Sequence, residues 1–148
     1  MSADALQFVL VGHLPATLFM TGVIWFVQVV HYPMMDAAER ENYPEYQRRH
    51  QSLTSYFVGP VMLFELATAI ALLYLTWTAG MPAWALAHLL SLAVTWISTF
   101  LIQVPCHERL AKGFSREAHR RLVKTNWIRT VAWTLRSALL LALFIDAK

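Results

Sequence analysis

Charged side chains are scarce in this sequence and unevenly spread. They make up 14% of the 148 residues, whereas hydrophobic residues make up 57%; about a quarter of a soluble domain is charged. No Asp, Glu, Lys or Arg occurs from Ala5 to Met35 or from Leu66 to His107. One crossing of a bilayer core needs about 20 apolar residues, so the second stretch is long enough for two crossings. The sequence therefore predicts an integral membrane protein rather than a soluble bundle.

Cysteine is nearly absent, and the common catalytic motifs are missing. The lone Cys106 excludes an internal disulfide. The sequence has no CxxC, phosphate-binding loop, nucleophile elbow, HxxH, HExxH or ExxH spacing. The N-terminal MSADALQFVL lacks the basic segment that opens a signal peptide, so we expect the first apolar run to be a retained helix. The pI near 9.3 reflects membrane orientation in a protein of this kind, and no nucleic-acid partner is predicted.

Four hydrophobic segments predict four transmembrane helices in a single domain that covers residues 1–148. The expected helices span about 6–33, 54–77, 84–106 and 125–145. The link at 78–83 is short, uncharged and turn-like, so the second and third helices must be antiparallel neighbours. The predicted fold class is an all-α, integral membrane four-helix bundle surrounded by membrane lipid.

The other two links are long and rich in Arg and Lys. Because these residues gather on the cytoplasmic side of membrane proteins, we expect both links in the cytoplasm and both termini outside, in a multi-pass protein of the bacterial inner (plasma) membrane. Pro44 is expected in a first helical turn, Gly113 as a helix stop and Ser115 as an N-cap. The second and fourth helices are then expected to begin as amphipathic extensions that turn into the bilayer.

The two halves of the chain resemble each other weakly. With a shift of 75 residues, Gln28 falls on Gln103; with a shift of 72, the Arg pair at 48–49 falls on the pair at 120–121. This pattern predicts two helical hairpins in the same orientation, a parallel repeat, although apolar helices also resemble one another by chance. If the repeat is real, the first and third helices are expected side by side.

Each expected helix carries a polar stripe on one face, at 100° per residue. Lipid does not solvate such groups, so the stripes should face one another inside the bundle, with Ser and Thr acting as interhelical contacts. Glu65 and Arg136 both lie roughly 14 Å deep at 1.5 Å per residue. We therefore expect an ion pair between Glu65 and Arg136, or between Glu65 and Arg129, which lies nearer to the cytoplasm. These three are the candidate catalytic residues; the pair either locks two helices together or forms a proton or substrate-anion site.

The histidines fall into two groups. His13 and His88 lie near the outer ends of the first and third helices. They are either interfacial side chains or axial ligands of a haem, since imidazole is a common haem ligand and a bundle core a common haem site. The other four gather at the inner side: His31, His50, His107 and His119. They are either solvated loop residues or part of a metal site, for which His31 and His107 are weak candidates.

Several segments resemble a known family. They are His13, HYP at 31–33, WALAH at 84–88 and RRLVKTN at 120–126. They are similar to segments of the haem-binding, four-helix protoporphyrinogen oxidases of bacteria. WALAH has His88 where that family has Lys, and WIRT follows Asn126 where that family has Glu-x-Pro. Anthrone-oxygenase-like and other uncharacterised four-helix families are similar in outline. The resemblance implies a bound haem b and an oxidoreductase activity.

Three functions follow as alternatives. The first is a membrane oxidoreductase acting on a hydrophobic or aromatic substrate, with a haem b held by His13 and His88. The second is a transport or proton-conducting bundle whose path is lined by Glu65, Arg129 and Arg136. The third is a structural or assembly subunit of a membrane complex, whose basic links dock a partner protein, a second copy or anionic lipid. A bound cofactor would favour the oxidoreductase. A water-filled cavity that reaches Glu65 would favour the transport bundle, and polar stripes that pack against each other without water would favour the structural subunit.

Overall fold

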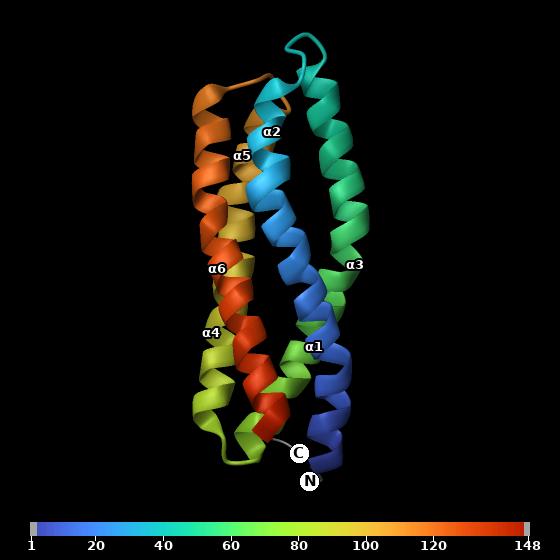
Figure 1. Ribbon diagram of the computed structural model, residues 1–148, viewed down its shortest axis with the longest axis vertical. Helices are drawn as coiled ribbons and strands as arrows, with labels where there is room; N and C mark the ends of the chain where they lie inside the picture. Colours follow the sequence, from blue (N-terminus) through green and yellow to red (C-terminus); the bar gives the residue numbers. More distant parts are fainter. Residues whose placement is uncertain (1–2, 147–148) are drawn as a thin grey trace.

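The computed structural model describes residues 3–146 as four long antiparallel rods (Figure 1). The first rod comprises α1 (Ala3–Phe26), a π-helical turn (Val27–His31), α2 (Tyr32–Met34) and a 3-10 turn (Met35–Ala37). The second rod is α3 (Tyr43–Thr78). The third comprises α4 (Pro82–Ser98), a π-helical turn (Thr99–Gln103) and α5 (Val104–Leu110), and the fourth is α6 (Arg116–Asp146). Residues 3–146 contain no strand.

All four rods are long and apolar enough to cross a membrane, which confirms the four predicted helices, and two of them begin before their apolar segments, as expected from Pro44 and Ser115. α3 begins at Tyr43, before the apolar segment from about residue 54, and α6 begins at Arg116, before the one from about residue 125. Hydropathy marks where the apolar surface ends, whereas the ends of a helix are set by its caps. Pro44 lies in the first turn of α3, and the Ser115 hydroxyl accepts from the Ala118 N–H at 3.3 Å. The extensions are therefore continuous with their helices and do not turn.

The rods are arranged in chain order around the bundle. α1 packs against α3 and α6, and α4 also packs against α3 and α6, so α1 and α4 lie on one diagonal of the bundle and α3 and α6 on the other. The expectation that the first and third helices lie side by side is wrong. A twofold axis along a bundle relates diagonal helices, so even a parallel repeat places the matching helices opposite each other.

The two ends of the bundle differ in what they carry. Both ends of the described chain and the turn at 79–81 lie at one end, here the terminal end, and the two charged links lie at the other, here the loop end (Figure 1). α3 bends near its middle (Figure 1), where Pro60 lies within the helix. Proline lacks an N–H and disturbs the preceding turn, so we attribute the bend to Pro60.

The first and third rods share a local feature near the loop end. In each, the residue before a proline donates its N–H to the carbonyl five residues back. The prolines, Pro33 and Pro105, cannot donate a backbone hydrogen bond, and the wider turn accommodates them. Each π-helical turn also places one amide side chain in the core, Gln28 in the first rod and Gln103 in the third.

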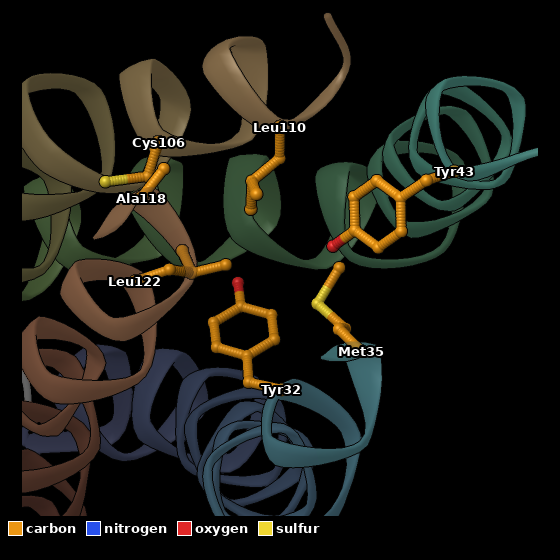
Figure 2. Close-up of a cluster of buried hydrophobic side chains, with 7 residues drawn as sticks. All are labelled: Tyr32, Met35, Tyr43, Cys106, Leu110, Ala118 and Leu122. Carbon is orange, nitrogen blue, oxygen red and sulfur yellow. The ribbon is translucent and has the colours of Figure 1, made fainter. Parts of the chain in front are cut away.

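Apolar and polar layers alternate along the core. The apolar cluster nearest the terminal end comprises Leu6, Leu10, Leu14, Leu72, Leu140 and Leu143. A middle cluster comprises Met20, Ile24, Met62 and Trp133. A third, drawn in Figure 2, comprises Tyr32, Met35, Tyr43, Cys106, Leu110, Ala118 and Leu122. Figure 2 shows the Tyr32 and Tyr43 rings pointing into this cluster from α2 and from the start of α3. The third cluster closes the core at the loop end.

Candidate functional site

Two groups of buried or half-buried polar side chains lie between these apolar layers, and each draws on all four rods. We call the group nearer the terminal end the ion-pair cluster; it comprises His13, Thr17, Glu65, Thr68, His88 and Arg136. We call the group nearer the loop end the Arg129 cluster; it comprises Tyr32, Gln47, His50, His107, Asn126 and Arg129. In both clusters polar residues of the predicted stripes face one another in the core, which confirms that part of the prediction.

Glu65 and Arg136 form the ion pair expected from the sequence. Arg136 Nη1 lies 3.5 Å from Glu65 Oε1, and the two side chains are 1% and 2% exposed. The Thr17 hydroxyl donates to Oε1 at 2.6 Å, and Trp133 Nε1 donates to Oε2 at 3.3 Å. Both carboxylate oxygens are thus engaged by donors from α1 and α6. A buried charge that is paired and hydrogen-bonded in this way is stable in the core, so the pair has the geometry of a lock between helices.

The His13 ring is held by hydrogen bonds on both sides. Arg136 Nη2 donates to His13 Nε2 at 3.1 Å, and since a guanidinium only donates, Nε2 carries no proton. His13 Nδ1 then donates to the Thr68 hydroxyl at 2.6 Å, which in turn donates to the Phe64 carbonyl at 2.7 Å. The His88 ring meets His13 edge-on, with the ring centroids 5.3 Å apart and the planes at 71°.

This arrangement of His13 and His88 does not fit a haem. An axial ligand must present a free nitrogen to the iron, but both nitrogens of His13 are already bonded to Thr68 and Arg136. The two rings touch each other, and the cavity beside His88 has a volume of about 10 Å³, which suits one water molecule and not a porphyrin. The His88 Nε2 atom is buried and has no hydrogen-bond partner.

Arg129 carries a buried positive charge that no acid balances. Its side chain belongs to a residue only 8% exposed, and no carboxylate of residues 3–146 lies within salt-bridge distance of it. Arg129 Nη1 donates to the neutral Asn126 Oδ1 at 3.3 Å, and the guanidinium carbon lies 5.2 Å from the centre of the Trp133 ring. Its Nε atom has no partner. An isolated buried charge is costly, so Arg129 is poised to receive an anion or a strong acceptor.

Tyr32 and His107 lie beside Arg129 and define the direction of a hydrogen-bond chain. The Tyr32 hydroxyl interacts with Arg129 and lies 2.9 Å from His107 Nε2. Gln47 Nε2, which can only donate, lies 2.6 Å from His107 Nδ1, so Nδ1 carries no proton. The ring proton of His107 then lies on Nε2, which donates to the Tyr32 hydroxyl, while Gln47 Oε1 is buried and has no partner.

His50 connects this chain to the loop end. His31 Nε2 lies 3.0 Å from His50 Nδ1, and the His50 and His107 ring centroids lie 5.4 Å apart. His50 therefore separates the two weak metal candidates, His31 and His107. Both nitrogens of His107 are hydrogen-bonded, and no group of three or more His, Cys, Asp or Glu side chains among residues 3–146 could hold a metal ion.

A cavity of about 330 Å³ opens beside the Arg129 cluster, between α1, α3 and the third rod. Its volume lies in the range of small-molecule sites. Its polar end is formed by Tyr32, His50, Thr54, His107 and Arg129. Its walls are apolar and include Met20, Ile24, Val58, Met62, Trp96 and Phe100. Leu63 and Phe100 line it and are also exposed on the surface of the bundle, so the cavity reaches the apolar exterior.

The sequence identified Arg129, His107 and His50 but not the roles of Tyr32 and Gln47. The sequence predicts an amphipathic helical extension from about Pro44, but helical spacing must also be applied to this extension to identify the side chains that face the core. With that spacing, Gln47 and His50 fall on one face of α3 together with Thr54. His119, expected in solvent, is instead buried, and its Nε2 donates to the Tyr32 carbonyl at 2.8 Å.

The resemblance to haem-binding protoporphyrinogen oxidases stays a prediction; the arrangement of His13 and His88 bears only on the haem. Comparison with known proteins found no matching family model, no similar curated protein and no similar solved structure.

Proposed function

We propose that this chain is an integral membrane protein that binds a lipid-soluble molecule with an anionic or strongly accepting headgroup, in the cavity beside Arg129. The observation that carries the proposal is the buried Arg129 guanidinium, which lines the cavity and has no carboxylate partner among the described residues. A negatively charged oxygen in the cavity would balance this charge and accept its free N–H. The ligand class is therefore an apolar or aromatic body with a carboxylate, phenolate or quinone-type oxygen.

Membrane insertion is supported by the outer surface of the bundle. All four rods are long and apolar enough to span a bilayer, and large apolar side chains are exposed along all of them, including Phe8, Leu63, Leu101 and Ile145. Patches of this extent are unstable in water. Basic residues in both links favour the loop end as the cytoplasmic end, in a bacterial inner membrane.

We also infer that the two hairpins form a parallel repeat. The inference is supported by the π-helical turn that precedes a proline in the first and third rods and by the arrangement of the rods, in which corresponding helices lie on diagonals. A pseudo-twofold of this kind explains why each polar cluster draws on all four rods.

Orientation can be tested by labelling single cysteines with a membrane-impermeant maleimide on intact cells. The native Cys106 is buried and provides an unlabelled background. Ala79→Cys, in the turn of the terminal end, should be labelled, and Lys112→Cys, in the second charged link, should be labelled only after the cells are opened. Labelling of Lys112→Cys in intact cells would reverse the assigned orientation.

The binding function is tested with matched ligands on purified protein in detergent. A long-chain alkyl phenol or fatty acid should raise the melting temperature, whereas the methyl ether or ester with the same chain should raise it far less. Arg129→Gln should abolish that difference, because a hydrogen bond to a charged group contributes about 1.5–3 kcal/mol. Equal binding of charged and capped ligands to the unaltered protein would contradict headgroup recognition by Arg129.

Gly59 provides a second, independent test because it lines the cavity. A Cβ added there meets no atom within 4 Å, so Gly59→Leu should fill the cavity without disturbing the fold. This variant should lose ligand binding and keep the Arg129 cluster intact. Gly22→Leu is the matched control, since a Cβ at Gly22 also meets no atom within 4 Å and Gly22 does not line the cavity. Unchanged binding by Gly59→Leu would place the ligand elsewhere.

Proton exchange with the bound molecule is a second candidate function, favoured by the contact between His31 and His50. His31 is half-buried at the loop end and His50 lines the cavity, with their nitrogens 3.0 Å apart. After a pH jump, a bound alkyl nitrophenol should change its ionisation more slowly in His31→Ala than in the unaltered protein. An unchanged rate would remove His31 from the proton path.

A further inference from the structure

A second cavity lies at the loop end of the bundle, beside the first turns of α6. Its volume is about 610 Å³, and it lies between the end of the first rod, the Phe114 link and the first turns of α6. Its lining includes Arg40, Arg116, Arg120 and Lys124. We call it the basic cleft. It shares no lining residue with the cavity beside Arg129.

The basic cleft carries an uncompensated positive charge. Asp36 is the only carboxylate in its lining, which against four cations gives a net charge of about +3. Arg116, Arg120 and Lys124 follow one another at four-residue intervals on one face of α6, and like charges at that spacing destabilise a helix. The acid of the first turn, Glu117, pairs instead with Arg109 at 3.1 Å. Because the repulsion among these cations destabilises the helix, their clustering indicates that an anion binds here.

Two residues hold the cleft in shape. The Arg40 guanidinium carbon lies 3.5 Å from the centre of the Phe114 ring, and Arg40 Nη2 donates to the Asp36 carbonyl at 2.7 Å. His119 ties α6 to the first rod through the Tyr32 carbonyl at 2.8 Å. Arg40, one of the four cations, is thus held in place, which lowers the entropy cost of binding an anion.

Apolar surface leads from the cleft toward the middle of the bundle. Pro33 and Val123 lie in the lining of the cleft. One helical turn further along each rod lie Val30 and Trp127, and beyond Val30 lies Phe26; all three are exposed. A ligand with its phosphate in the cleft could therefore lay an acyl chain along α1 and α6. This continuity favours a phospholipid over a soluble phosphate compound.

We propose that the basic cleft binds the phosphate headgroup of an anionic phospholipid, with Arg40, Arg116, Arg120 and Lys124 around the phosphate and the acyl chains along α1 and α6. The proposal rests on the membrane insertion inferred above and not on the ligand of the Arg129 cavity. Basic sites between helices at the cytoplasmic face recognise lipid headgroups in this way, and each Lys or Arg near the surface contributes about fivefold in affinity.

The test measures lipid binding to delipidated full-length protein in neutral detergent at 150 mM salt, by native mass spectrometry. Phosphatidylglycerol should bind at least tenfold more tightly than phosphatidylcholine. Arg40→Gln/Arg120→Gln should weaken phosphatidylglycerol binding by about 25-fold, from about fivefold for each cation. The control, Arg48→Gln/Arg49→Gln, removes the same charge from α3 at the same end, outside the lining of the cleft, and should change binding by less than threefold. Arg120→Gln alone guards against misfolding, because Arg120 makes no ion pair among residues 3–146.

Three outcomes would overturn the proposal. Equal affinity for the two lipids would show that the cleft does not recognise an anionic headgroup, and an equal loss in the control variant would show a diffuse field instead of a site. Displacement of the lipid by an equal concentration of inorganic phosphate or glycerol phosphate would assign the cleft to a soluble phosphate. The membrane assignment itself is checked separately, because the chain must float with liposomes and resist alkaline extraction. The Arg129→Gln protein should keep its lipid preference.

Discussion

The ion-pair cluster and the Arg129 cluster contain the same types of side chain but differ in how the charge of their arginine is balanced. Each contains a buried arginine, two histidines and side chains from all four rods. In the ion-pair cluster Arg136 faces Glu65, and both carboxylate oxygens and both nitrogens of His13 are engaged. In the Arg129 cluster the guanidinium faces neutral acceptors and an aromatic ring and lines a cavity. The first is charge-balanced, although Arg136 Nε has no partner; the second is open to a cavity and carries a net positive charge.

The difference between the two clusters indicates that a buried charge can bind a ligand when no group of opposite charge within the protein pairs with it. A paired charge in a dry core contributes specificity or a lock between helices. An unpaired charge at a cavity wall raises the free energy of the protein until a ligand compensates it. Under the proposed function, the roles expected for Glu65, Arg129 and Arg136 together are divided: Glu65 and Arg136 hold the bundle together, and Arg129 faces the ligand.

The largest effect is expected from breaking the balanced pair. Glu65→Gln leaves Arg136 as an uncompensated buried cation and should lower the free energy of unfolding by about 3–5 kcal/mol, measured by titration with a denaturing detergent in mixed micelles. The double variant Glu65→Gln/Arg136→Met should recover much of that loss, because no lone charge remains. A loss of less than 1 kcal/mol for Glu65→Gln would mean that the pair does not lock α3 to α6.

A smaller effect separates the two histidines that touch in the ion-pair cluster. His13→Phe removes the hydrogen bonds to Thr68 and Arg136 and should cost about 2–3 kcal/mol, since one of them involves a charged group. His88→Phe removes a ring whose buried Nε2 has no partner and should cost less than about 1 kcal/mol. The same mixed-micelle titration measures both. If the two histidines ligated a haem together, the two substitutions would have matching effects and would remove a Soret band.

The four helices, the stripes and the Glu65–Arg136 pair could be predicted from the sequence because hydropathy and depth are properties of single segments. The order of helices around the bundle could not, since it depends on which faces meet after folding. For the same reason His13 and His88, correctly placed at one depth, meet across a diagonal and touch. The cavity beside Arg129 could not be predicted either, since its lining comes from side chains of several rods that meet only in the folded bundle.

Removal of the buried charge from the Arg129 cluster should not destabilise the protein, in contrast to its removal from the ion-pair cluster. Arg129→Gln, measured on ligand-free protein, should leave the free energy of unfolding within about 1 kcal/mol of the unaltered value or raise it, because an isolated buried charge is lost. Its effect should therefore be far smaller than that of Glu65→Gln, although both remove one buried charge. A loss of 3 kcal/mol or more would show that Arg129 is compensated within the protein and would remove the reason to expect an anionic ligand.

The smallest effect is expected from an ion pair in water, which calibrates the other comparisons. Arg109 Nη2 lies 3.1 Å from Glu117 Oε2, closer than the charged atoms of the buried pair, but the side chains are 59% and 78% exposed. Surface pairs contribute about 0–1 kcal/mol, and Glu117 also stabilises the first turn of α6 through the helix dipole. Glu117→Gln should therefore lower the free energy of unfolding by less than about 1 kcal/mol and should matter less in high salt. If it cost as much as Glu65→Gln, distance alone would govern these pairs, and the distinction between closed and open environments drawn for Arg136 and Arg129 would lose its basis.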